Sequence, residues 1–183
     1  SAGKTPLLEQ LGDSLARSDI PVLSMRIALY QPDIPQNAGT IIRTAVCFGL
    51  GIDLIEPCGF VLSDRHFRRA GLDYLAAATI ERHPNWAAFR AFHKAPARLV
   101  LLTTSAECVY TEFAYRDTDI LLAGRESGGV PADVHAKVEA RVRIPLKPGA
   151  RALNVAVAVA MVVGEALRQT GGASAGGNGP TPL

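Results

Sequence analysis

The sequence MRIALYQPDIPQNAGTIIRTAVCFGLGIDLI, residues 25–55, holds two short apolar runs separated by a helical pattern. Residues 26–30 and 52–56 have the length and apolar content of buried strands. Between them, the apolar side chains of residues 38–49 recur at helical spacing, and Asn37 is a suitable residue to cap the helix. A strand, a helix and a second strand in this order predict two parallel strands joined by a helix.

The same alternation continues along the chain and predicts an α/β fold, a mainly parallel sheet flanked by helices. Further strands are predicted at 98–103, 120–124 and 142–146, with a weaker one at 79–82. Further helices are predicted at 63–70, 86–94, 132–139 and 153–169. The last of these is apolar on almost every side, so it lies either deep in the core or half-buried against another subunit. A homodimer is the hypothesis that follows.

The length of 183 residues predicts a single domain. Residues 1–24 mix Gly, Ser, Pro and charged residues, and residues 171–183 are rich in Gly and Pro. We therefore expect an N-terminal extension that is flexible or not native, a working domain at 25–170, and a flexible tail. A domain of that size is long enough to bury a real core.

The composition, with 48% hydrophobic and 20% charged residues, is typical of a globular protein. It excludes collagen, a coiled coil and general disorder. The longest uncharged apolar run, 152–164, is too short to cross a bilayer, and no signal peptide is recognisable, so we expect a cytoplasmic protein without membrane contact. The three cysteines form neither a disulfide framework nor a zinc pattern, and no two of the four histidines stand at metal-ligand spacing. We therefore expect no metal.

The net charge of +2 does not by itself indicate nucleic-acid binding. Of the 19 basic residues 15 are Arg, which suits contacts with phosphates, although a GC-rich genome is the simpler explanation. The segment RHFRRAGLDY, residues 65–74, places Arg68 and Arg69 beside aromatic residues. A solvated helix face and a patch that contacts phosphate explain this cluster equally well.

Three unusual loops follow predicted strands: TTSAE (103–107), GRESGGVP (124–131) and PLKPGARALN (145–154). Ligands of open parallel sheets bind beyond the carboxyl ends of the strands, and glycine lets the backbone approach them closely. The sequence contains neither GxGxxG after the first strand nor GxxxxGK[ST]. A conventional Rossmann dehydrogenase and a P-loop NTPase are therefore disfavoured.

Five ordered motifs carry a resemblance to a known family: PDIPQNAGTIIR (32–43), IEPCGF (55–60), RRAGLDY (68–74), GRESGGVP (124–131) and RIPLKPGARALNVAVAVA (143–160). Through them, nearly all of residues 25–170 resembles the SPOUT, or trefoil-knot, methyltransferases. Within that family the chain is most similar to the small tRNA 2′-O-methyltransferases that modify the wobble nucleotide, cytidine or uridine at position 34. The resemblance implies S-adenosylmethionine as cofactor, tRNA as partner, a homodimer and a knotted C-terminal part.

The resemblance also implies roles for individual residues. The cofactor would be lined by Leu102, Gly124, Ile144, Leu146, Ala152 and Leu153. Arg43 would activate the ribose 2′-OH; since a guanidinium has a pKa above ~12, stabilising the nascent alkoxide or positioning the hydroxyl is easier for it than removing a proton.

The remaining motif residues are expected to support the site. Asn37 would cap its helix and hold Arg43 in place, Glu126 would bond backbone amides, and Asn154 would cap the last helix. Arg68, Arg69 and Arg151 would contact RNA.

Two alternatives stay open. One is a 2′-O-methyltransferase that acts on another tRNA site or on rRNA. The other is a non-catalytic RNA-binding dimer, for which Ala152 is the first indication, because this group often has Ser there. Calorimetry with S-adenosylmethionine separates an enzyme from a dimer that has lost catalysis.

Overall fold

The computed structural model describes residues 25–61, 79–94 and 97–171. It contains one parallel sheet in the order β3-β2-β1-β5-β4-β6. The strands are β1 (Arg26–Tyr30), β2 (Gly51–Ile55), β3 (Ile80–His83), β4 (Arg98–Leu102), β5 (Asp119–Ala123) and β6 (Ala140–Val142). The helices are α2 (Pro35–Cys47), α4 (Trp86–Phe92), α5 (Ala132–Ala136) and α6 (Val155–Thr170). The predicted α/β class is confirmed.

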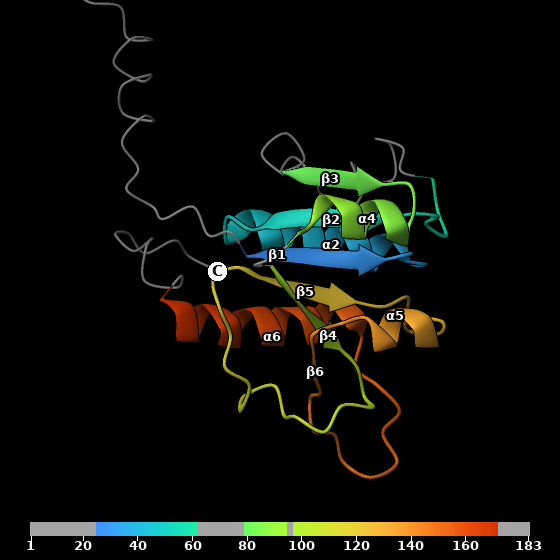
Figure 1. The fold of residues 1–183 in the computed structure, drawn as a ribbon. Coiled ribbons are helices and arrows are strands. Elements are labelled where there is room, and N and C mark those ends of the chain that lie inside the picture. The colour runs from blue at the N-terminus through green and yellow to red at the C-terminus, as the bar shows by residue number, and fades with distance from the viewer. Residues whose placement is uncertain (1–24, 62–78, 95–96, 172–183) are drawn as a thin grey trace, which may run out of the picture.

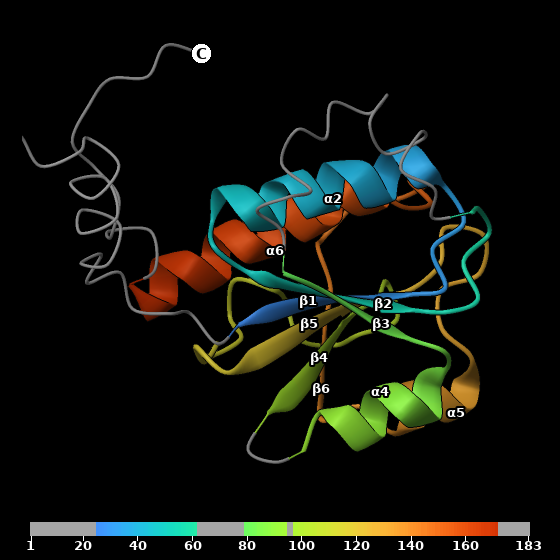
Figure 2. The ribbon, with the colours of Figure 1, turned by 90° about the horizontal axis from the view of Figure 1, so that it is seen from above.

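Helices cover both faces of the sheet, with α2 and α6 on one face and α4 and α5 on the other (Figures 1 and 2). The alternating side chains of β1 supply both layers. Ile27 and Leu29 belong to the core under α2 and α6, whereas Ala28 and Tyr30 belong to the core under α4 and α5. This burial on both faces explains why the strands read as continuous apolar runs.

At the start of the last helix valines alternate with alanines, a pattern that a strand also shows, whereas the length and the alanine content of the segment favour a helix. The structure makes it a helix of 16 residues that is followed by the capping residue Gly171, whose φ of 75° suits glycine. Val159, Val162 and Val163 are buried against the sheet, while Val157 is 50% exposed. The helix is therefore not wholly inside the core, and contact of its exposed side with another subunit stays a prediction.

Several predicted boundaries were wrong. The strand expected at 142–146 is Ala140–Val142, and the residues after it form a loop that leads into the cavity described below. The helix expected at 38–49 already begins at Pro35, since proline is favoured in the first turn. The helix expected at 63–70 lies outside the described residues, as do 1–24 and all of the expected tail except Gly171. The strand order does not establish the knot, which stays a prediction.

Candidate functional site

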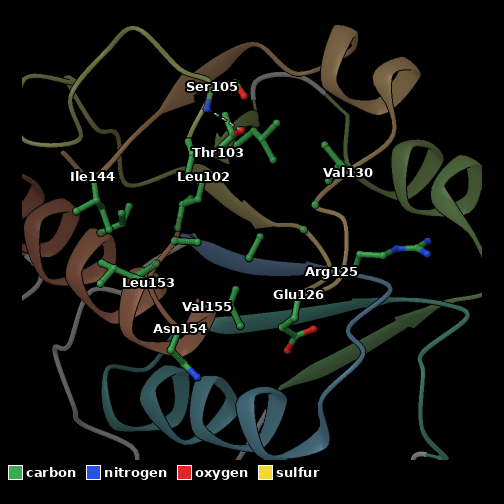
Figure 3. A pocket seen from close by; sticks show the side chains of 18 of the residues that line it. Leu102, Thr103, Ser105, Arg125, Glu126, Val130, Ile144, Leu153, Asn154 and Val155 are labelled. Atoms are coloured by element: carbon green, nitrogen blue, oxygen red, sulfur yellow. Dashed lines mark hydrogen bonds between the residues drawn. The ribbon is translucent and has the colours of Figure 1, made fainter. Parts of the chain in front are cut away.

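A cavity of about 560 Å³ opens where β4, β5 and β6 end. This volume is within the range of small-molecule sites. Its walls come from three loops, at 102–105, 123–130 and 142–155, and from residues of α2, α5 and α6 (Figure 3). These are the three loops that the sequence analysis singled out, and the shared edge of the parallel sheet brings them together.

The six positions expected to line a cofactor all line this cavity. They are Leu102, Gly124, Ile144, Leu146, Ala152 and Leu153. Figure 3 shows Leu102, Ile144 and Leu153 on one side of the cavity, with Glu126 and Asn154 beside α2. The cavity thus has an apolar wall and a polar wall.

Asn37, Glu126 and Asn154 form the polar wall as one hydrogen-bonded chain. Asn154 Nδ2 donates to Asn37 Oδ1 at 2.9 Å, and Asn37 Nδ2 donates to Glu126 Oε1 at 3.0 Å. Glu126 Oε2 accepts from the backbone N–H of Asp33 at 2.8 Å. Because both oxygens of Glu126 are engaged, its carboxylate holds the loop after β5 against the loop after β1.

The prediction that Asn37 caps its helix was wrong. The cap position is Ile34, and no side chain bonds the first turn from there. Asn37 lies in the first turn of α2, is 9% exposed, and uses its amide for the chain described above. Asn154 is a cap as expected, since its side chain accepts from Ala156 N and Val157 N.

A second bridge joins the same two loops at their outer end. Asp33 Oδ2 accepts from the hydroxyl of Ser127 and from its backbone N–H, the latter at 3.0 Å. These bonds favour the charged carboxylate and lower the pKa of Asp33. Arg125 is held nearby, with a hydrogen bond to the side chain of Gln31 and with its guanidinium 5.8 Å from the Tyr30 ring centroid.

Gly124 lets two stretches of backbone meet behind the cavity. A Cβ placed on it would lie 2.5 Å from the carbonyl carbon of Gly129. Gly129 itself has a φ of 64°, and it pairs with Arg125 through two backbone hydrogen bonds of 3.0 and 2.8 Å. The two glycines together close the turn that presents Glu126.

Of the arginines predicted to act in catalysis or in RNA binding, none that the structure describes is found among the residues that line the cavity. Arg43 is exposed on α2 and is not among the residues that line the cavity. Arg151 is exposed in the loop before α6, also outside the lining. Arg68 and Arg69 lie outside the described residues. The structure therefore brings the cofactor candidates together but leaves Arg43 on a neighbouring surface.

Sequence reasoning missed several residues of the site. Ile34 and His135 also line the cavity. His135 lies on the short helix α5, and no motif marks it; Arg141 Nε donates to its Nδ1 at 3.0 Å. A separate cluster, in which His83 and His93 meet Asp53, was also missed, because its members are far apart in the sequence.

The model of the SpoU rRNA Methylase family matches residues 24–164. The chain belongs to this family. Its SpoU relatives include the tRNA (cytidine(34)-2'-O)-methyltransferases of Beijerinckia indica subsp. indica and Escherichia coli K12. The first is 60% identical over 79% of this chain and 91% of its own length, and the second 40% identical over 80% and 94%.

Solved SpoU structures share the fold. One, which concerns the 2-OH methylation of C/U34 on tRNA, has a TM-score of 0.76 and 41% identity, and covers 79% of this chain and 95% of its own. An AdoMet-bound rRNA methyltransferase from Sinorhizobium meliloti has a TM-score of 0.72 and 30% identity, and covers 79% of this chain and 56% of its own. The resemblance read from the sequence motifs is confirmed.

Proposed function

We propose that this SpoU protein transfers a methyl group from S-adenosylmethionine to the ribose 2′-O of nucleotide 34 in tRNA. The observation that carries the proposal is the single cavity in which all six expected cofactor positions meet the chain of Asn37, Glu126 and Asn154. The names of the close relatives supply the substrate, since the two tRNA methyltransferases reported above match this chain over nearly their whole length.

The residues of the cavity fit S-adenosylmethionine. Leu102, Ile144, Leu146 and Leu153 offer an apolar surface to an adenine ring, while Thr103 and Ser105 offer hydroxyls and backbone groups to the polar parts. Ala152 lines the same cavity. Because alanine has no side-chain hydroxyl, we expect polar contacts at this position to come from the backbone of the loop. When bound, the cofactor supplies an electrophilic methyl group on a sulfonium.

Arg43 is the proposed catalytic residue, and its role is electrostatic. A ribose hydroxyl becomes a strong nucleophile only as it loses its proton, and a fixed guanidinium stabilises the charge that develops on the oxygen. Asn37 lies on the same helix and ties it to the loops of the cavity. We assign Asn37, Glu126 and Asn154 to positioning rather than to chemistry.

We also propose a homodimer through α2 and α6. These helices lie side by side on one face of the sheet (Figure 2), and the α6 side chains of Val157 and Met161, one turn apart, are 50% and 37% exposed. Arg43 is exposed on α2. A symmetric pairing of this face would bring the Arg43 of each protomer toward the cavity of its partner.

The decisive experiment is mass spectrometry of nuclease digests of tRNA after incubation with the protein and labelled S-adenosylmethionine. The expected product is a 2′-O-methylated nucleoside at position 34. A methyl group at another tRNA site, or on rRNA only, would support the alternative substrate. Absence of any product, together with no cofactor binding by calorimetry, would instead support a non-catalytic RNA-binding dimer.

The three cysteines, Cys47, Cys58 and Cys108, are unpaired in the structure. This supports the proposed location in the reducing cytoplasm, where tRNA is modified. None of the described helices is both long and apolar enough to span a membrane.

A further inference from the structure

A buried cluster of three ligand-type side chains lies under α4, apart from the cavity. Asp53 on β2 is fully buried, His83 at the end of β3 is 4% exposed, and the side chain of His93, just after α4, is 10% exposed. The Nε2 atoms of both histidines lie close to one oxygen, Asp53 Oδ1, at 2.7 and 2.8 Å. None of the three residues lines the cavity.

We propose that Asp53, His83 and His93 form a binding site for a divalent transition-metal ion of the zinc type. Imidazole nitrogen and carboxylate oxygen are ligands that Zn²⁺ accepts at about 2.0–2.2 Å. The three ligand atoms lie within 4.8 Å of one another, so small rotations of the imidazole rings bring all of them to one ion. Three protein ligands leave one position of a tetrahedral ion for water.

The surroundings of the cluster are those of a metal site. Arg26 Nε donates to Asp53 Oδ2 at 2.6 Å, so the other oxygen alone faces the histidines. Such a partner orients a metal-binding carboxylate. The rings of Phe89 and Phe92 lie with centroids 4.9–5.3 Å from the two imidazoles and form an apolar shell.

The charge balance predicts reversible binding. Without a metal ion, Asp53 Oδ1 accepts a hydrogen bond from each Nε2, and Asp53 Oδ2 accepts one from Arg26. An imidazole that binds a metal ion through Nε2 carries its proton on Nδ1 instead, so binding requires the other tautomer of each ring. Because both oxygens of Asp53 already have hydrogen-bond partners, the fold does not depend on the ion. The positive charge of Arg26 also weakens the attraction for a cation. An ion, when bound, joins β2, β3 and the end of α4.

The test uses the full chain, free of metal and of any histidine tag, titrated with Zn²⁺ against a chromophoric chelator. We expect one equivalent to bind. His93→Gln should weaken binding by more than about 100-fold, since even partners outside the ligand set contribute 10–100-fold. Two controls should bind like the original chain: His135→Gln, and a variant in which Cys47, Cys58 and Cys108 are Ser. Circular dichroism checks that each variant is folded.

X-ray absorption of the Zn²⁺-loaded original chain needs no variant and decides the case if His93→Gln does not fold. Two imidazoles with one carboxylate and no sulfur support the proposal. Absence of stoichiometric binding, sulfur ligation, or unchanged binding in folded His93→Gln would overturn it. None of these measurements depends on methyl transfer, so the outcome is separate from that of the proposed function.

Discussion

At the scale of single residues, Gly124 shows how little space separates the loops behind the cavity. In Gly124→Ala the new Cβ would meet the backbone of Gly129, which cannot rotate away. We expect a loss of about 1–3 kcal/mol in the free energy of unfolding, together with weaker binding of S-adenosylmethionine. Urea unfolding and calorimetry measure the two effects.

Gly128 is the matched control, because the nearest atom to its added Cβ is Arg125 Cδ at 4.0 Å. Gly128→Ala should change stability and cofactor binding little. Equal effects of the two substitutions would contradict the crowding argument.

Arg43 is the residue on which the proposed chemistry depends. Arg43→Ala should abolish methyl transfer to tRNA and leave the affinity for S-adenosylmethionine nearly unchanged, since Arg43 does not line the cavity. Single-turnover kinetics and calorimetry measure these separately. Full activity of the variant would refute the assignment.

Cys58 belongs to the IEPCGF motif, and burial, followed by the charge of Glu56, raises the pKa of its thiol to about 11. Only the thiolate reacts with iodoacetamide. In the folded protein, the alkylation rate of Cys58 should therefore keep rising with pH toward 11, whereas in urea it should level off above the ordinary value of 9.0. Peptide mapping by mass spectrometry follows the residue. Identical pH profiles in both states would contradict the expected shift.

At the scale of elements, β4 and β5 are joined by a buried ion pair as well as by their backbones. Arg98 Nε and a terminal nitrogen donate to the two oxygens of Asp119 at 2.9 and 2.8 Å, and Asp119 is fully buried. Arg98→Met removes the cation and leaves a buried carboxylate. We expect a loss of about 3–5 kcal/mol in the free energy of unfolding, measured with urea.

The comparison for this pair is Arg90→Met. Arg90 pairs with Glu139 at 3.4 Å, and both side chains are more than a third exposed. Its loss should reduce the free energy of unfolding by about 1 kcal/mol or less. Similar losses in the two variants would show that burial of Asp119 does not set the energy of the pair.

At the scale of the whole molecule, the exposed apolar face of α6 predicts a dimer. Light scattering at micromolar concentration should give about twice the 19.4 kDa of one chain. Val157→Asp with Met161→Asp should give monomers, because charges would be buried in the interface. Val61→Asp is the control, since Val61 is 76% exposed and lies outside both helices. A monomeric mass for the original chain would refute the dimer.

Mixed dimers test whether Arg43 serves the partner's cavity. Arg43→Ala and Asn37→Ala should each be inactive alone. If Arg43 acts across the dimer, co-expression of the two should restore about a quarter of the original activity, because half of the dimers are mixed and each has one intact site. No restored activity would place Arg43 in its own protomer's site.

Much of the fold was predictable because each element has a local signal. The apolar runs of β1, β2, β4 and β5 were found within one residue at each end, and α6 was separated from a strand by its length and alanine content. The predicted loops also reached the correct edge of the sheet, because parallel strands share one carboxyl end. The start of α2 and the position of β6 were predicted wrongly. At both places the residues next to the element suit the helical or strand pattern as well as the residues within it.

The sequence by itself determined the α/β class and the family, because these depend on periodicity and on motifs that are continuous in the chain. Through the resemblance it also predicted six residues that line one cavity in the structure. Only the tertiary structure decided how Asn37 is used, that Arg43 does not line the cavity, and that Asp53, His83 and His93 meet. The physical reason is distance along the chain. Asn37 and Asn154 are 117 residues apart, and Asp53 and His93 are 40 apart. Such contacts form only when parallel strands bring remote segments to the same edge or face, and no local pattern encodes them.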